Sequence, residues 1–377
     1  MDERDDINKY REKRKRRSRT IKFIVFVLVS AAVIIFIINW KEILAPFKDI
    51  GTKTGKGGFP VNLTGSANYV LGDMGENFYL LTDTYLYTYN DEGAKIANEQ
   101  HGFQNPVCSS NDKRALVYDK NGKEMKLYSK NSEIFSQSFE DSIVFAKMGT
   151  DERSAVVTTS SRYSNFLYVL NSEGKQIFRW ASPDEKIMQV CFGADDKSIY
   201  VSVVGEKDGT LNSGVLRFEI DSDKSELWRA AIGGSVSYSL QKCSDGIYAV
   251  TPTGSFLLDE RTGEVKASNA YSNEVCGIAE TNGIRVTFFR DPVSNGETAN
   301  VFNDKLETSS AISLESLAAF DTDGGKLYIL VGNDLTVYDS NLKELQRYEL
   351  DDEYSDIKII GKYAYLLGYN TVQRQDL

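Results

Sequence analysis

The sequence predicts an all-β protein, an eight-bladed β-propeller, preceded by a single N-terminal transmembrane helix. Two observations lead to this prediction. A pattern of four short strands recurs about every 41 residues after residue 59, which is the spacing of propeller blades. One uncharged apolar run, residues 23–38, precedes the repeats and follows a strongly basic tail. The chain accordingly divides into a basic tail (1–20), a membrane helix (21–40), a linker (41–58) and a propeller (59–377). A seven-bladed ring is the alternative.

The apolar segment 21–40 has the length of a membrane span. About 20 residues in a helix cross the ~30 Å of hydrocarbon in a bilayer, and only a helix satisfies the backbone of such a segment there. Trp40 stands where an aromatic residue is expected at the membrane surface. A cleaved signal peptide is the alternative, but the apolar stretch exceeds a usual signal core and no small-x-small site follows it. We therefore expect an uncleaved anchor that contacts the lipid bilayer through residues 21–40.

Charge predicts the orientation of this anchor. Residues 1–22 carry ten basic and five acidic side chains, a net charge of +5, and such a tail remains in the cytoplasm. Because the whole chain has a net charge of −10, the residues after it have −15. We expect the N-terminus in the cytoplasm and the propeller outside it, in the cell envelope, tethered by the flexible linker 41–58. An acidic propeller disfavours nucleic acid as a partner.

The repeat consists of a polar turn followed by a short apolar strand. Such a turn occurs eight times, at intervals that average about 41 residues and match the ~40–45 residues of a four-stranded blade. The strand before each turn is short and rich in small or apolar residues, as an inner strand near a central axis must be. We label the strands of a blade A (inner) to D (outer). The first apolar residues of the B strands are Phe78, Ala115, Ala155, Ile199, Ile247, Ile284, Leu327 and Ala364.

The last unit is incomplete, and the start of the repeat region supplies what it lacks. Residues 356–360, 363–369 and 372–377 give the A, B and C strands, after which no further segment follows. Residues 59–63 read as a strand without a partner. We predict that they form the missing D strand, which closes the ring and removes two exposed sheet edges.

Three segments carry a blade motif of a known superfamily. Residues 259–267 (DERTGEVKA), 171–180 (NSEGKQIFRW) and 220–228 (IDSDKSELW) resemble the D-x-x-T-G-x-x-x-W motif of quinoprotein-like eight-bladed propellers. That superfamily includes outer-membrane assembly lipoproteins and quinone-dependent alcohol dehydrogenases. The chain also resembles uncharacterised membrane-anchored bacterial propellers with a basic tail. The resemblance implies the fold and eight blades, and it implies no particular activity.

Few residues offer catalytic chemistry. His101 is the only histidine, so a histidine-based zinc site or a Ser-His-Asp triad would have to use it. It falls in the loop between a D strand and the next A strand, where we expect a surface histidine. The acidic turns 221–224 and 321–325 lack the distant glutamate of a calcium loop and are expected to be Asx turns. We therefore predict no metal ion and no cofactor.

The tryptophans and cysteines have structural interpretations. Trp180 and Trp228 fall in D strands, where we expect them to pack between blades and not to stack on a quinone. Cys108, Cys191, Cys243 and Cys276 fall one in each of four A strands, and buried thiols explain them. A disulfide between Cys243 and Cys276, which lie in neighbouring blades, is the one pairing left open.

Three long B–C turns mark a candidate binding surface. Most B–C turns have two to four residues, but those at 159–165, 205–213 and 290–298 are longer. B–C and D–A turns share one rim of a propeller, and long loops on a rigid scaffold often carry binding residues. We expect this rim to bind an envelope protein, peptide or glycan. A propeller-based enzyme (a quinone- or metal-dependent oxidoreductase or a lyase) and a structural spacer without ligand are the alternatives. The candidate binding residues are Arg162, Tyr163, Lys207, Asp208, Arg290 and Asp291.

Overall fold

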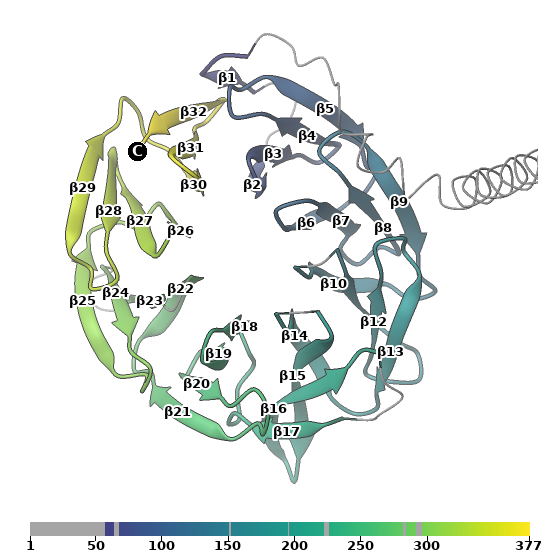
Figure 1. Ribbon diagram of the computed structural model, residues 1–377. Coiled ribbons are helices and arrows are strands. Elements are labelled where there is room, and N and C mark those ends of the chain that lie inside the picture. Colours follow the sequence, from purple (N-terminus) through teal and green to yellow (C-terminus); the bar gives the residue numbers. More distant parts are fainter. Residues whose placement is uncertain are drawn as a thin grey trace, which may run out of the picture. The chain divides into compact units, whose positions relative to one another are not determined.

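The protein folds into a ring of eight four-stranded antiparallel sheets (Figure 1). The computed structural model describes residues 57–63, 68–150, 152–194, 196–221, 226–281, 284–291 and 296–377. Eight sheets confirm the predicted eight-bladed propeller and exclude the seven-bladed alternative. The predicted tail, membrane helix and most of the linker lie outside the described residues. Within the described part, no helix combines the length and apolarity needed to cross a membrane.

The strands of a blade lie in chain order from the centre outwards, except that the outer strand of blade 8 is β1. Blade 1 holds β2 (Val70–Met74), β3 (Asn77–Leu81), β4 (Tyr85–Tyr89) and β5 (Lys95–Gln100). Blade 2 holds β6 (Pro106–Ser110), β7 (Ala115–Asp119), β8 (Glu124–Tyr128) and β9 (Glu133–Ser138). Blade 3 holds β10 (Ile143–Met148), β11 (Ser154–Thr158), β12 (Asn165–Leu170) and β13 (Gln176–Ser182). Blade 4 holds β14 (Lys186–Phe192), β15 (Ser198–Lys207), β16 (Thr210–Glu219) and β17 (Trp228–Ala231).

The second half of the ring follows the same order. Blade 5 holds β18 (Ser239–Cys243), β19 (Gly246–Thr251), β20 (Gly254–Leu258) and β21 (Val265–Ala270). Blade 6 holds β22 (Glu274–Thr281), β23 (Ile284–Arg290), β24 (Glu297–Phe302) and β25 (Thr308–Leu314). Blade 7 holds β26 (Ala319–Asp323), β27 (Lys326–Val331), β28 (Asp334–Tyr338) and β29 (Glu344–Glu349). Blade 8 holds β30 (Asp356–Ile360), β31 (Tyr363–Leu367), β32 (Thr371–Asp376) and β1 (Val61–Asn62).

The position of a strand in its blade explains its residue pattern. The B strands are sandwiched between two neighbouring blades and are almost entirely buried, as in β11, all five residues of which are buried. The D strands face solvent, and β29 is mostly exposed and polar. The core therefore lies in the gaps between blades. In one such gap, Val157 and Leu167 of blade 3 belong to the same buried cluster as Val203 of blade 4.

The ring closes as predicted, by pairing the start of the described chain with its end. β1 runs antiparallel to β32, with Val61 opposite Val372 and Asn62 opposite Thr371. Val61 and Leu63 are buried in a cluster that also contains Phe78 of blade 1. The short strand thus completes blade 8 and at the same time packs on blade 1.

One predicted loop is wrong. Residues 205–213 are mostly strand, because β15 and β16 continue past the edge of the blade as a two-stranded ribbon and pair through Lys207 and Thr210. The connection is a tight turn at Asp208 and Gly209, both with positive φ (54° and 76°). This is the backbone geometry of a type I′ hairpin, for which Asp-Gly is a preferred sequence.

Candidate functional site

The B–C turn of blade 3 presents the first pair of predicted binding residues. The hydroxyl of Ser160 accepts the backbone N–H groups of Arg162 and Tyr163 at 3.2 and 3.1 Å, which fixes the turn. Arg162 is exposed and its guanidinium lies 5.5 Å from the centre of the Tyr163 ring. The ring of Tyr163 packs edge-on against Phe166, with centroids 5.3 Å apart. The two side chains therefore form one surface unit with β12.

The second pair, Lys207 and Asp208, lies at the tip of the projecting β15–β16 hairpin. Both residues are exposed. Glu206 accepts the backbone N–H of Gly209 at 2.7 Å, and the hydroxyl of Thr210 donates to the carbonyl oxygen of Lys207 at 2.7 Å. These bonds hold the tip in one conformation, so the pair is presented on a defined scaffold.

The third pair, Arg290 and Asp291, is less available. Arg290 forms an ion pair with Glu297 across the base of its turn, at 3.6 Å. The backbone of Asp291 donates to the carbonyl oxygen of Gly296 at 2.9 Å. Residues 292–295 of this turn lie outside the described residues. The charge of Arg290 is thus partly compensated within its own blade.

The ring topology places the three pairs on the same rim but not in one site. Blades 3 and 4 are neighbours, whereas blade 5 separates blade 4 from the third pair in blade 6. Lys186 of blade 4 contacts the turn of the first pair, since its ammonium donates to the carbonyl oxygen of Ser164 at 3.1 Å. Sequence reasoning missed Lys186, because the contact joins residues of two blades.

Sequence reasoning also missed a row of stacked aromatic and arginine side chains beside the first pair. We name it the blade 3 ladder. The guanidinium of Arg179 on β13 lies 4.0 Å from the ring centre of Phe166 and 5.4 Å from that of Tyr168. The Tyr168 ring in turn contacts Phe139, at 5.3 Å between centroids. The alternation of aromatic and apolar residues in β12 was the signal that could have found it. The ladder consists of Arg162, Tyr163, Phe166, Arg179, Tyr168 and Phe139.

The prediction of a surface position for His101 is wrong. The residue lies in the predicted D–A loop, but only 2% of it is exposed. Its Nδ1 accepts the N–H of Phe103 at 3.1 Å, and Nε2 lies 3.1 Å from the carbonyl oxygen of Thr82. This pairing requires the neutral tautomer with a proton on Nε2, which donates to Thr82. Burial lowers the pKa of His101, so the imidazole is a structural bridge between two loops.

The cysteines are free thiols in the A strands, as predicted. Cys191 and Cys243 are buried, Cys108 and Cys276 are partly buried, and the Cys243–Cys276 disulfide does not form. Burial raises the pKa of Cys243 to about 12. A thiol with so high a pKa is a poor nucleophile at neutral pH. Among the described residues, no three His, Cys, Asp or Glu side chains are grouped as metal ligands would be.

The tryptophans pack between blades, as predicted. Trp180 contacts Phe218 of the next blade, with centroids 4.9 Å apart. Trp228 donates its indole N–H to the carbonyl oxygen of Glu260 at 3.1 Å. Its ring lies against Gly263, which has a positive φ of 75° and where a Cβ atom would meet the indole at 2.5 Å. The glycine of the D-x-x-T-G motif thus leaves room for the tryptophan of the preceding blade.

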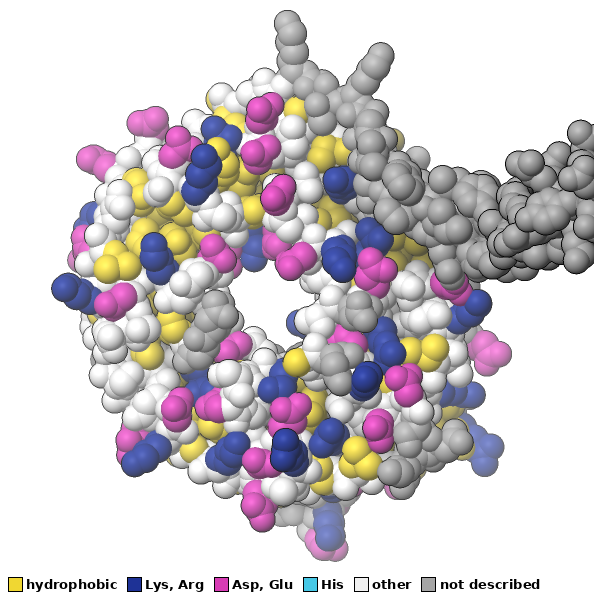
Figure 2. Space-filling view, viewed as in Figure 1, with side chains coloured by type: hydrophobic (Ala, Val, Ile, Leu, Met, Phe, Trp, Pro, Cys, Tyr) yellow, Lys and Arg dark blue, Asp and Glu magenta, His cyan; other side chains and the backbone are white. Residues whose placement is uncertain are grey.

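The centre of the ring is open in the space-filling view, and charged side chains of both signs surround it (Figure 2). On the inner strands, Lys358 of blade 8 lies 3.3 Å from Asp73 of blade 1 and 3.3 Å from Asp321 of blade 7. These neighbouring carboxylates raise the pKa of Lys358 despite its burial. These ion pairs join blades 7, 8 and 1 around the axis, so the cluster has a structural role as a contact between blades.

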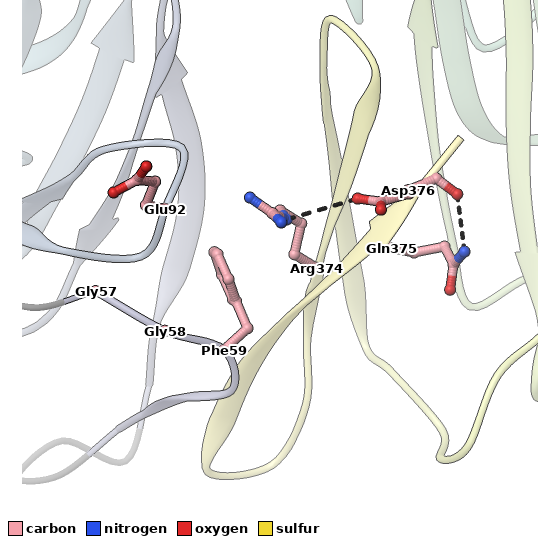
Figure 3. Close-up of a pocket in the computed structure, with 7 residues that line it drawn as sticks. All are labelled: Gly57, Gly58, Phe59, Glu92, Arg374, Gln375 and Asp376. Atoms are coloured by element: carbon pink, nitrogen blue, oxygen red, sulfur yellow. Dashed lines mark hydrogen bonds and ion pairs between the residues drawn. The ribbon is translucent and has the colours of Figure 1, made fainter.

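A polar pocket of about 600 Å³ lies where the ring closes (Figure 3). Arg374 points across it between the rings of Phe59 and Tyr363, at 5.1 and 4.1 Å from their centres. Its guanidinium donates to the carbonyl oxygen of Asp91 in blade 1 at 2.7 Å. Arg374 is thereby occupied in fastening blade 8 to blade 1. The pocket is lined by Gly57, Gly58, Phe59, Glu92, Arg374, Gln375 and Asp376.

Solved propellers resemble this ring closely enough to show the fold. BamB from Moraxella catarrhalis matches with a TM-score of 0.54 and 10% identity, over 84% of this chain and 100% of that chain. Sqt1 from Saccharomyces cerevisiae matches with a TM-score of 0.61 and 8% identity, over 86% and 99%. AztD from Citrobacter koseri, in its apo form, matches with a TM-score of 0.53 and 10% identity, over 78% and 88%. At these identities the likeness concerns the propeller alone.

The sequence itself assigns a family. No curated protein matches the chain. Residues 60–373, almost the whole ring, match DUF5711, a family of unknown function. The chain therefore belongs to the DUF5711 family.

Proposed function

We propose that the protein is a membrane-anchored, extracytoplasmic binding or scaffold module that engages an envelope protein, peptide or glycan. The anchor is residues 21–40, oriented by the basic tail before them. The binding surface is the rim that carries the B–C and D–A turns. The ring serves as a rigid support for this rim.

The observation that carries the proposal is the projecting surface formed by blades 3 and 4. There the β15–β16 hairpin extends beyond its blade. The turn at 159–164 is held against blade 4 by the hydrogen bond from Lys186 to Ser164. On these elements, Arg162 is exposed and Tyr163 is half-buried. Arginine and tyrosine are enriched at protein interfaces because they combine contact area with hydrogen bonding.

The place where the chain enters the ring supports the choice of rim. Gly57 and Phe59 lie beside Arg374 and Asp376, at the end of β32 that faces the A–B and C–D turns. The described chain thus enters the ring on the rim opposite the proposed binding surface.

Topology is tested first. Alkaline phosphatase fused after Leu377 is expected to be active in intact cells, because the enzyme requires an oxidising compartment. A cytoplasmic reporter fused at the same position should be inactive. The reverse pattern would refute both the anchor orientation and the envelope assignment.

Binding is tested by crosslinking in cells, followed by capture of the full-length protein. The variant with Arg162, Tyr163 and Arg290 all changed to Ala should capture its envelope partner at least tenfold less. The matched control changes Asp112, Lys113 and Lys326 to Ala, which are exposed charges on the A–B turns of the other rim. Loss of capture in the control, with normal capture in the first variant, would show that the partner binds the opposite rim, which carries the A–B and C–D turns.

A further inference from the structure

The blade 3 ladder has a composition and geometry that suit one kind of ligand. It begins at Arg162 in the B–C turn and runs along β12 into the gap between blades 2 and 3, where Phe139 ends it. The three central rings are only partly buried, and both arginines are exposed. Consecutive members lie 4.0 to 5.5 Å apart, so the row is continuous. Core packing does not require exposed cations, so this continuous row is a candidate surface for binding a ligand.

The two guanidiniums are positioned to bind carboxylates. Neither Arg162 nor Arg179 forms an ion pair within the part of the chain that the structure describes, whereas Arg229, Arg290 and Arg347 all do. A guanidinium stacked on a ring still directs its N–H donors outwards in its own plane. A carboxylate can accept two of these donors side by side. Stacking also reduces the side-chain entropy that binding would cost.

The aromatic spacing suits an extended chain. Phe166 and Tyr168 are alternate residues of β12, so they point from the same side of the strand and repeat every ~6.6 Å. Alternate side chains of an extended peptide have the same repeat. Because the Arg179 guanidinium lies over one face of the Phe166 ring and one face of the Tyr168 ring, those faces are closed to a ligand, and the ring edges remain as an apolar contact surface. Face-to-face stacking of a sugar ring or a base is therefore disfavoured.

We propose that the blade 3 ladder binds an extended acidic peptide, in which carboxylate and apolar side chains alternate along one side, at every second residue. The carboxylates pair with Arg162 and Arg179, and the apolar side chains contact the edges of Phe166 and Tyr168. Lys186, beside the same turn, adds a third positive charge. The inference rests on the proposed function and names the chemistry of its partner. Since the whole chain is acidic, attraction acts at contact range and not as long-range steering.

The test uses the full-length protein in detergent micelles and fluorescence anisotropy of a short labelled peptide with the repeat Glu-Ser-Val-Ser, in which Glu and Val share one side of the extended chain. Two comparison ligands replace Glu by Gln, or replace the peptide by a uronic acid polymer. We expect the Glu peptide to bind at least tenfold more tightly than the Gln peptide. The substitutions Arg162→Gln and Arg179→Gln should each weaken binding about tenfold or more. Arg347→Gln, an exposed outer-strand arginine of blade 7, is the matched control and should have no effect.

A further variant separates stacking from charge alone. Arg179→Lys keeps the charge but loses the planar fork, so it should weaken binding nearly as much as Arg179→Gln. Equal affinity for the Glu and Gln peptides, tighter binding of the uronic acid polymer, or unchanged affinity in Arg179→Gln would each overturn the proposal. If Arg179→Gln binds the peptide normally while the rim variant loses its partner in cells, the ladder assignment fails and the proposed function stands.

Discussion

At the scale of single residues, His101 shows how burial fixes a protonation state. Its Nδ1 accepts the N–H of Phe103, so a proton on that nitrogen would face a backbone donor. The protonated form therefore costs both the hydrogen bond and the desolvation of a charge. Both effects agree with the lowered pKa of His101.

This pairing predicts that stability depends on pH. Because the pKa of His101 is lower in the folded than in the unfolded state, its contribution is complete above about pH 6.5 and is lost as pH falls below that value. Denaturant titrations should show the wild type losing more stability between pH 7 and pH 5 than His101→Gln. As the only histidine, it also gives a single imidazole NMR signal. A titration midpoint at or above 6.5 would contradict the assignment.

Phe59 occupies the place that Trp228 holds in another blade. In blade 4, Tyr200, Arg217 and Trp228 lie opposite one another and contact the C–D turn of blade 5 at Glu260. In blade 8, Tyr365 and Arg374 are paired in the same way and contact Asp91 of blade 1. Phe59, just before β1, lies with its ring centre 5.1 Å from the Arg374 guanidinium and packs against Gly93, as Trp228 packs against Gly263. The closing interface is thus a copy of an internal one, with phenylalanine in place of tryptophan.

This equivalence predicts a stabilising substitution. Phe59→Trp should fill part of the closing pocket and add an indole N–H bond to the carbonyl oxygen of Asp91. The net gain of one such bond is about 1 kcal/mol, or roughly 2 °C in melting temperature for a ring of this size. Trp228→Phe, the reverse change, should lower the melting temperature by a similar amount. A lower melting temperature for Phe59→Trp would show that the two interfaces are not equivalent.

At the scale of strands and turns, the sequence predicted the regular elements better than the projecting one. Every B strand was predicted, because burial on both faces requires an unbroken run of apolar and aromatic residues such as residues 115–118. Residues 205–213 are predicted as a loop because most of this ribbon is exposed and, apart from Leu211, its residues are polar or glycine. The Asp208–Gly209 pair was the local sign of a hairpin. Its strands beyond Val204 have no blade to pack on, so no apolar pattern marks them.

Closure by β1 can be tested without removing any residue. Val61 is buried against blades 8 and 1, whereas its neighbour Asn62 points to solvent. Val61→Lys should reduce the free energy of unfolding by about 2 to 3 kcal/mol, since it removes a buried apolar side chain and places a charge there. Asn62→Lys is the matched control and should change it by less than about 0.5 kcal/mol. Equal effects in the full-length protein would argue against the predicted closure.

At the scale of the whole molecule, the repeat length predicted the ring but not the site. A period of about 41 residues reports blades, because each blade repeats one folding pattern. The blade 3 ladder joins Phe139 of blade 2 with Tyr168 and Arg179 of blade 3. Such contacts depend on how neighbouring blades pack, and no local pattern encodes them. The predicted loop residues Arg162 and Tyr163 identified one end of the ladder, and the structure supplied the rest.

Ring closure also predicts cooperative unfolding. In an open array of repeats, the end units lose a neighbour and can unfold separately. In the closed ring, every blade has two neighbours, so we expect one calorimetric transition with equal calorimetric and van't Hoff enthalpies. Val61→Lys should make the calorimetric enthalpy exceed the van't Hoff value. If the substitution lowers the melting temperature but leaves the ratio at one, closure contributes stability without controlling cooperativity.

The brevity of β1 has a mechanical consequence. Tension applied to the chain before Gly57 reaches the ring first at Phe59, and then at a strand of two residues. When the opposing load acts at the end of β32, beside the start of the antiparallel β1, the pairs with Val372 and Thr371 separate one after the other and not together. Every other blade is joined to its neighbours through continuous chain at both ends. Under a pulling force the molecule should therefore open between blades 8 and 1 before any other seam, which makes the closing strand a force-sensitive release point.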